Sequence, residues 1–133
     1  MITEQEITIY NKFTDVNKQV TWHKTPLVGT YRNTSILNRT KTGSNTNDTA
    51  LLRIFDTSKY VDEKEYKKKL NVDVWTAQIG DIVVDKNVDF DITSTAPITE
   101  LQKQYGKAHV QSIVSIDDNR KGTVLDHIKV GLK

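Results

Sequence analysis

A chain of 133 residues has about the commonest length of a single domain, so residues 1–133 are expected to fold as one unit. With 36% hydrophobic and 27% charged residues the composition is not that of a disordered chain, and 19 basic against 17 acidic residues leave a net charge of +2, a weak argument for nucleic-acid binding. The absence of cysteine excludes disulfides, thiolate metal sites and cysteine nucleophiles, and fits assembly in a reducing cytosol.

Membrane and export signals are not expected. No apolar run approaches the roughly 20 residues that a membrane helix needs. Residues 1–6 are polar and acidic and lack the apolar stretch of a secretory signal.

Two strands are predicted near the start of the chain. Ile7, Ile9 and Phe13 alternate with polar or aromatic residues, which predicts a half-buried strand over residues 7–13. The composition of residues 15–18 predicts a turn. Residues 19–31 then predict one long strand or two, in which Pro26 marks a sheet edge or a bulge and Gly29 a second irregularity.

Residues 39–49 contain no apolar side chain and are rich in Gly, Ser, Asn, Asp and Thr, which predicts a loop. The segment is long for a connection between two strands, and long loops are usually functional or disordered. We therefore expect it to be mobile in the isolated protein and to face a channel or a neighbouring subunit in an assembly. The candidate contact residues in this loop are Arg39, Lys41, Ser44, Asn45 and Asn47.

The middle of the chain alternates short apolar runs with one charged run. Residues 50–55 and 82–84 are predicted strands, and the first is placed centrally because its apolar run is dense. Residues 62–69 form either a helical turn, since acidic residues precede basic ones, or a surface loop. The candidate charged contact face of this run consists of Lys64, Lys67, Lys68 and Lys69.

A short helix is predicted over residues 97–105. Pro97 suits a first helical turn because its missing N–H would have no partner there. Glu100 early and Lys103 late match the helix dipole, and Gly106 suits a left-handed cap.

The C-terminal residues predict a hairpin. Residues 109–116 and 123–132 alternate as two strands, and residues 117–122 form a polar turn in which Gly122 is free to take a positive φ. The apolar faces are expected to consist of Val110, Val114 and Ile116 in the first strand and Val124, Ile128, Val130 and Leu132 in the second. These faces need cover, so the predicted fold is mainly β, a small β-barrel or sandwich with one short helix and one long polar loop.

No catalytic, metal or cofactor motif is found. The three histidines, His23, His109 and His127, have no local ligand spacing, so surface or rim positions are expected for them. No nucleophile elbow, phosphate-binding loop or dinucleotide fingerprint is present in the sequence. We therefore expect no enzymatic activity and no cofactor.

Two further groups of residues allow a functional interpretation. Four carboxylates suggest calcium, but they lack the EF-hand spacing, so solvation of turns and strand edges is favoured: Asp81, Asp85, Asp89 and Asp91. Four aromatic residues suggest stacking on a single nucleic-acid strand, although core packing is the simpler interpretation: Tyr60, Tyr66, Trp75 and Phe90.

Both ends of the chain carry a family resemblance. Residues 7–13 read ITIYNKF, residues 20–31 read VTWHKTPLVGTY, and residues 110–133 read VQSIVSIDDNRKGTVLDHIKVGLK. These segments resemble a family of uncharacterised small proteins from phages and prophages of Gram-positive bacteria, encoded among the head and head–tail joining genes. Similar family members carry T-W-H-[KR]-T at the first site and D-N-R-x-G at the second.

The resemblance implies a virion structural protein at the head–tail interface, a head-completion protein of the stopper type. Such proteins are small β-barrels that assemble into rings on the portal–adaptor stack, where a long polar loop can close the DNA channel. The implied partners are the adaptor, portal, tail terminator or tail tube, with non-specific contact to packaged DNA and none to a membrane. The implied location is the virion, after assembly in the host cytoplasm.

Two alternatives remain open. A tail terminator or minor capsid protein belongs to the same class and fits the sequence about as well. A nucleic-acid-binding barrel of the OB type, with the aromatic residues and residues 67–69 as its contacts, belongs to another class.

Overall fold

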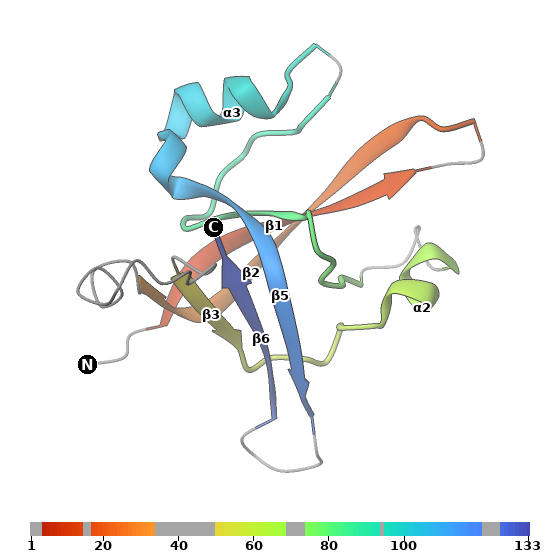
Figure 1. The fold of residues 1–133 in the computed structure, drawn as a ribbon, viewed down its shortest axis with the longest axis vertical. Coiled ribbons are helices and arrows are strands. Elements are labelled where there is room, and N and C mark those ends of the chain that lie inside the picture. The colour runs from red at the N-terminus through yellow and green to blue at the C-terminus, as the bar shows by residue number, and fades with distance from the viewer. Residues whose placement is uncertain (1–3, 15–16, 34–49, 69–73, 94, 121–125) are drawn as a thin grey trace, which may run out of the picture.

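The structure is a computed structural model that describes residues 4–14, 17–33, 50–68, 74–93, 95–120 and 126–133. Six strands form a closed antiparallel barrel in the order β1-β2-β3-β6-β5-β4 (Figure 1). The strands are β1 Glu4–Thr14, β2 Val20–Asn33, β3 Ala50–Ile54, β4 Ile82–Val84, β5 Val110–Asn119 and β6 His127–Leu132. The helical elements are α2 Glu63–Lys68, α3 Ile98–Tyr105 and the 3-10 turn η1 Lys107–His109. The predicted mainly β fold is confirmed, and it is a barrel rather than a sandwich.

One hydrophobic core fills the barrel. Strand residues alternate between the two faces of the wall, so every second side chain points inward. The inward side chains on β1, β3 and β6 are fully buried: Ile7, Ile9, Ala50, Leu52, Ile54, Ile128, Val130 and Leu132. Trp75, which follows α2 in the chain, closes this core with 1% of its surface exposed.

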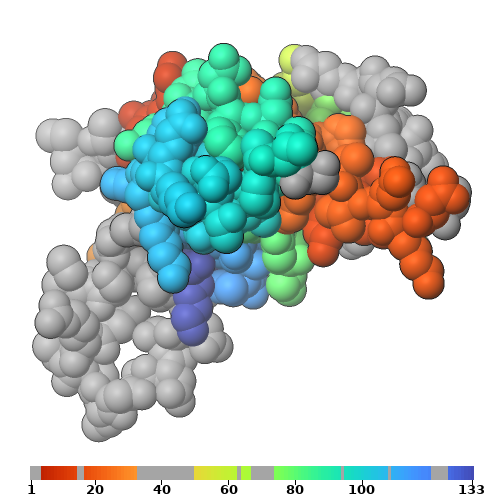
Figure 2. Space-filling model, turned by 90° about the horizontal axis from the view of Figure 1, so that it is seen from above, coloured from red at the N-terminus to blue at the C-terminus, as the bar shows by residue number. Residues whose placement is uncertain are grey.

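A second core lies on the outer side of the same wall. Tyr10 of β1 and Val84 of β4 point outward and pack with Leu101 of α3. The segment after β4 and helix α3 form a continuous cover over this face, beside the β1–β2 hairpin (Figure 2). Strand β1 is therefore buried on both faces over residues 7–11, where Thr8 and Tyr10 are as inaccessible as Ile9. The prediction of a half-buried strand at residues 7–13 is wrong for this stretch, whereas Lys12 is exposed as predicted for the polar face.

A buried polar cluster closes one end of the barrel. Asn11 donates its side-chain N–H to Asp81 Oδ2 at 2.8 Å and to the Thr76 carbonyl at 2.6 Å. The Asp81 carboxylate also accepts the backbone N–H groups of Lys12 at 3.0 Å and Gln78 at 3.1 Å. Because burying a carboxylate without partners is costly, these bonds keep β1, β4 and the 76–78 segment together.

Other elements agree with the sequence in different degrees. Helix α3 ends where predicted, and Gly106 caps it with φ 98°. The charge run forms a helix, α2, rather than a surface loop. Strand β2 is one strand, and Gly29 does not interrupt it. A Cβ at this glycine would lie 2.8 Å from the Arg53 carbonyl oxygen, so Gly29 permits a close approach of β2 and β3. The predicted loop over residues 39–49 lies outside the described residues.

The C-terminal hairpin is confirmed with two corrections. Strand β5 extends to Asn119, so residues 117–119 are strand and not turn. A register shift between Ile113 and Ser115 interrupts the alternation, so Ile113 is fully buried and Val114 is only half-buried. In β6 the predicted face of Ile128, Val130 and Leu132 is buried, whereas residues 121–125, with Gly122 and Val124, lie outside the described part.

The buried carboxylate is expected to stabilise the fold. Asp81→Asn places an N–H₂ group against N–H donors, and leaving such donors unsatisfied costs about 1–3 kcal/mol. The free energy of unfolding, measured by urea denaturation, should fall by that amount. The matched variant Asp117→Asn changes an exposed carboxylate and should stay within about 0.5 kcal/mol of the parent. Equal stability of both variants would contradict this role of Asp81.

Candidate functional site

Strand β2 has an edge that no described strand covers. It pairs with β1 over residues 20–30 but with β3 only over residues 30–33. The β1–β2 hairpin reaches beyond the barrel (Figure 1), and β1 is the one described strand that pairs with residues 20–29. We call this stretch, residues 20–29 of β2, the open edge.

The direction of the backbone groups follows from the contacts of Lys12. Its N–H donates to Asp81 at 3.0 Å and its carbonyl accepts from Gln78 Nε2 at 3.2 Å, so its backbone points away from β2. Trp22 lies opposite Lys12, so it is a non-hydrogen-bonded partner, and its own N–H and carbonyl point away from β1. This direction alternates along a strand. The backbone groups that point to the open side of β2 therefore belong to Val20, Trp22, Lys24, Pro26 and Val28.

Pro26 fits this geometry. It has no N–H, and its position is one at which an N–H would point away from β1. The ladder between β1 and β2 therefore loses no hydrogen bond. The sequence prediction that Pro26 marks an edge is confirmed, and the alternative of a bulge is wrong because the register runs through it without a shift.

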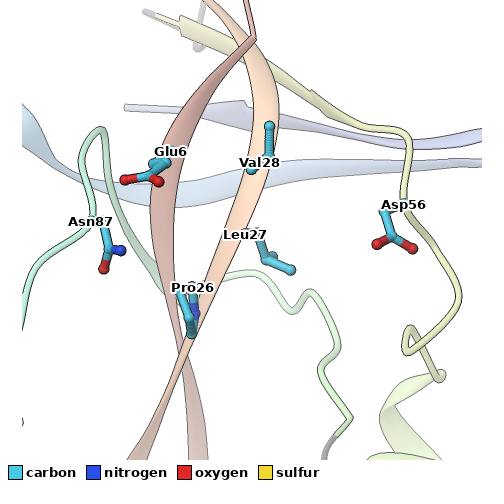
Figure 3. A pocket seen from close by; sticks show the side chains of 6 residues that line it. All are labelled: Glu6, Pro26, Leu27, Val28, Asp56 and Asn87. Carbon is cyan, nitrogen blue, oxygen red and sulfur yellow. The ribbon is translucent and has the colours of Figure 1, made fainter.

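Three surface hollows border the open edge. The first has a volume of about 240 Å³ and is lined by Glu6, Pro26, Leu27, Val28, Asp56 and Asn87 (Figure 3). The second, of about 230 Å³, lies beside it and reaches Ser58, Lys59 and Trp75. The third, of about 580 Å³, is lined by residues 19–22, at the start of β2, and by residues 91–93. The two ends of the open edge thus lie next to concave surface.

The open edge exposes two apolar side chains, and acidic side chains lie at one of its ends. Val20 and Val28 are 47% and 48% exposed, unusually high for apolar strand residues. Asp56 accepts the Ser58 hydroxyl at 2.7 Å and its backbone N–H at 3.2 Å. These bonds lower the pKa of Asp56, so its carboxylate stays ionised at neutral pH. Glu6 is exposed on the other side of Val28 (Figure 3).

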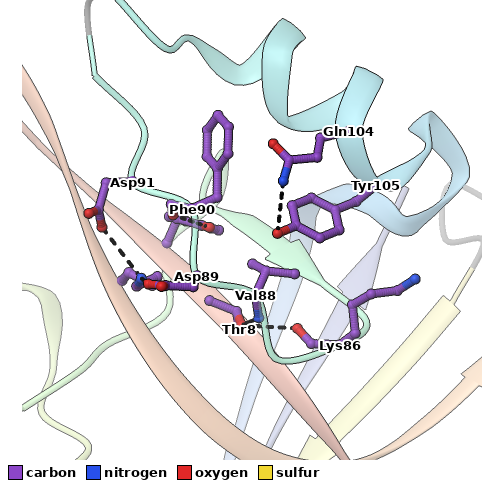
Figure 4. A network of polar contacts seen from close by, with 10 residues as sticks. Thr8, Lys86, Val88, Asp89, Phe90, Asp91, Gln104 and Tyr105 are labelled. Carbon is purple, nitrogen blue, oxygen red and sulfur yellow. Dashed lines mark hydrogen bonds and ion pairs between the residues drawn. The ribbon is translucent and has the colours of Figure 1, made fainter.

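Residues 86–92, which we call the strap, cross the outer face of β1 towards the open edge. Thr8 Oγ1 donates to the Lys86 carbonyl at 2.9 Å and accepts the Val88 N–H at 3.1 Å (Figure 4). The Tyr10 hydroxyl donates to the Phe90 carbonyl at 2.6 Å. Burial, and to a smaller degree the Asp91 carboxylate, raises the pKa of Tyr10 far above its usual value, so this donor keeps its proton. The strap is therefore held on β1 by neutral hydrogen bonds.

The four carboxylates for which calcium was the less favoured interpretation do not converge. Asp81 belongs to the buried cluster, and Asp85 contacts His109 Nδ1 at 2.8 Å. Asp89 and Asp91 lie 3.1 and 3.5 Å from Lys24 Nζ, which joins the strap to β2. Within the described ranges, no group of three or more His, Asp or Glu residues is placed to hold a metal ion.

The histidines lie in separate places. His23 contacts the rings of Phe13 and Tyr66, with ring centroids 6.4 and 6.2 Å apart. His109 lies at the surface beside Asp85, and His127 lies against Phe55 at 5.2 Å on the β5–β6 hairpin.

The aromatic residues favour the core interpretation. Trp75 and Tyr66 are 1% and 3% exposed, which leaves no ring face for a base to stack on. Tyr60 packs edge-on against Trp75 at 4.9 Å and is covered on one side by the Arg120 guanidinium at 4.6 Å.

The sequence-predicted contact residues lie on α2 or outside the described residues. Lys64 is exposed on α2, Lys67 and Lys68 belong to the same helix, and Lys69 falls outside the described residues. The loop candidates Arg39, Lys41, Ser44, Asn45 and Asn47 also lie outside them. The first hollow, which we call the acidic hollow because Glu6 and Asp56 line it, was not predicted from the sequence, since these two residues are fifty positions apart. Pro26 was the one local signal for the open edge.

The fold and the site define the class of this molecule: a small closed-barrel protein with an open strand edge. The chain belongs to a protein family of unknown function, DUF6751, whose family model matches residues 2–133. No curated protein and no solved structure matches the chain. No helix in the described residues has the length and apolar character that crossing a membrane requires.

Two proline substitutions test the direction of the open edge. In Val28→Pro the lost N–H points outward, so the free energy of unfolding should change by less than about 1 kcal/mol. In Thr25→Pro the lost N–H is bonded to β1, and the expected loss is about 1–3 kcal/mol. Urea denaturation of both variants measures the difference, and Val28→Thr controls for the loss of the valine side chain. A larger loss for Val28→Pro than for Thr25→Pro would reverse the assignment.

Proposed function

We propose that this protein is a virion assembly protein without catalytic activity, acting at the phage head–tail interface as a stopper-like head-completion protein. The observation that carries the proposal is the open edge of β2 in an otherwise closed barrel. Closure removes strand edges, so an edge that remains is the part of a barrel best suited to binding another polypeptide. The family resemblance of the two chain ends supports the same role.

The proposed partners are the adaptor, portal, tail terminator or tail tube. In a ring each subunit needs two different contact surfaces, since neighbours meet head to tail. The exposed face of α2 with Lys64 is a candidate for the contact between copies, and the open edge is left for a different virion protein. We place the protein in the virion, after assembly in the host cytoplasm. A tail terminator or minor capsid protein is the second candidate within the same class.

Deletion of the gene from the phage or prophage that encodes this chain tests the function. Particles from the deletion strain should include DNA-free heads and unattached tails, and infectious titre should be restored by the gene supplied in trans. Electron microscopy and titration measure both effects. Normal particle yield, genome content and infectivity in the deletion strain would overturn the proposed function. Tailless heads that keep their DNA would favour the tail-terminator alternative.

Affinity for single-stranded DNA separates the proposed function from the nucleic-acid alternative. Because basic side chains are interleaved with acidic ones and Trp75 is buried, we expect binding at physiological salt to be weak and independent of base sequence. Fluorescence anisotropy with a labelled oligonucleotide measures this affinity. A dissociation constant below about 1 μM at that salt would favour an OB-type function instead.

A further inference from the structure

We propose that the open edge of β2 binds an extended segment of a partner protein, which carries an apolar residue and, about six positions away, a Lys or Arg. The inference rests on the proposed assembly function and deepens it, because it specifies the partner's chemistry and the mode of contact. The partner adds a strand to the sheet beside residues 20–28.

The backbone supplies the first part of the interaction. Val20, Trp22 and Lys24 each present an N–H and a carbonyl to the open side, and Pro26 presents a carbonyl. No described strand pairs with these groups. An extended segment can satisfy them in register, which is how strand addition binds a peptide largely independently of its sequence.

The groove at one end of the edge supplies the apolar contact. Val20, Trp22 and Ile92 line the hollow of about 580 Å³ between β2 and the strap. The strap is held in place by Tyr10 and by the ion pairs of Lys24, so this hollow exists before a partner binds. A side chain of the added strand that points to the outer face of the sheet enters it.

The hollow at the other end supplies the charge. The Asp56 carboxylate is ionised and Glu6 is exposed beside Val28, so this end attracts a cation (Figure 3). Along this edge one hollow is lined by residues 19–22 and the other by residues 26–28, so their midpoints lie about six residues apart. An added strand therefore spans the separation with roughly six positions, and an even number places both side chains on the same face.

Charge also argues against a second copy of the chain as the occupant. If two β2 edges paired antiparallel over residues 20–28, the acidic end of each copy would face the Val20 end of the other. Lys24 is the one Lys or Arg in this stretch, and it already pairs with Asp89 and Asp91, so a second copy would bring no basic side chain to Asp56 and Glu6. We therefore infer a different protein as the partner.

Site-specific photo-crosslinking in assembled particles tests the inference. Benzoyl-phenylalanine is introduced at Val20 and at Val28 on the edge, and at Ile79, which is 73% exposed but lies off the edge, as the matched control. Adducts from Val20 and Val28 should map by mass spectrometry to one extended segment of one virion protein, with the apolar residue nearest Val20 and the basic residue nearest Val28. The Ile79 position should give several times fewer adducts with that segment.

A charge reversal isolates the acidic hollow. Asp56→Lys should lower the yield of the Val28 adduct about fivefold, because one exposed ion pair with the partner is lost and such pairs change a binding constant by about this factor. The control Asp117→Lys reverses an exposed carboxylate elsewhere and should leave the yield unchanged. Circular dichroism checks that both variants fold.

The outcomes separate this inference from the proposed function. Loss of infectious particles in the deletion strain, together with Val20 and Val28 adducts to the same chain, to a second copy or to no protein, would overturn the strand addition and leave the assembly function standing. A normal deletion strain whose edge adducts map to a non-virion protein with the expected segment would overturn the function and support the strand addition. Equal yields from Asp56→Lys and its control would overturn the charge contact.

Discussion

The burial of both faces of β1 over residues 7–11 is the constraint on which the rest of the structure depends. In this stretch Ile7 and Ile9 fill the barrel, and Tyr10 on the opposite face belongs to the outer core. A strand shared by two cores cannot shift its register, because a slip of one residue would exchange the two faces. The positions of β2, β4 and the strap all follow from their contacts with this strand.

The open edge arises from unequal strand lengths. Strand β2 has 14 residues and its neighbour β3 has 5, so β3 can cover only part of β2. On the other side of the hairpin, β1 has 11 residues and β4 has 3, and the strap and the Asp81 cluster take over where β4 ends. Side chains and loop backbone therefore cover the surplus of β1, whereas within the described residues no strand other than β1 pairs with residues 20–29 of β2.

Local sequence patterns predicted the helix and strands well, but they predicted less well which side chains are buried and what these side chains pack against. The helix at residues 97–105 and the face of Ile128, Val130 and Leu132 were predictable, because capping residues and alternation act over short distances. The second core was not predictable, since a polar residue such as Thr8 reads as exposed until a distant segment supplies its hydrogen bonds. The bulge before Ser115 was missed for a similar reason: no local residue announces it, and it exchanges Val114 for Ile113 in the core.

The candidate site was predictable only through Pro26. The hollows need residues from β1, β2 and the segment after β3, and their meeting depends on barrel closure, which alternation alone does not determine. The sequence patterns instead pointed to long polar and charged segments, because local reasoning detects unusual composition and not unpaired backbone.

Pro26 also bears on how selective such an edge can be. An uninterrupted edge pairs with almost any extended chain, and natural proteins limit this by placing proline and charged residues there. By removing one outward N–H, Pro26 forfeits a backbone bond worth about 0.5–1.5 kcal/mol to any arriving strand. Burying one apolar side chain contributes about 1.5–3 kcal/mol, so the hollow beside Val20 and Trp22 can more than offset that loss for a strand with a matching side chain. Pro26 thus weakens backbone pairing, which is open to any extended sequence. For the strand addition that we propose, selectivity then depends on the side chains that fill the hollows.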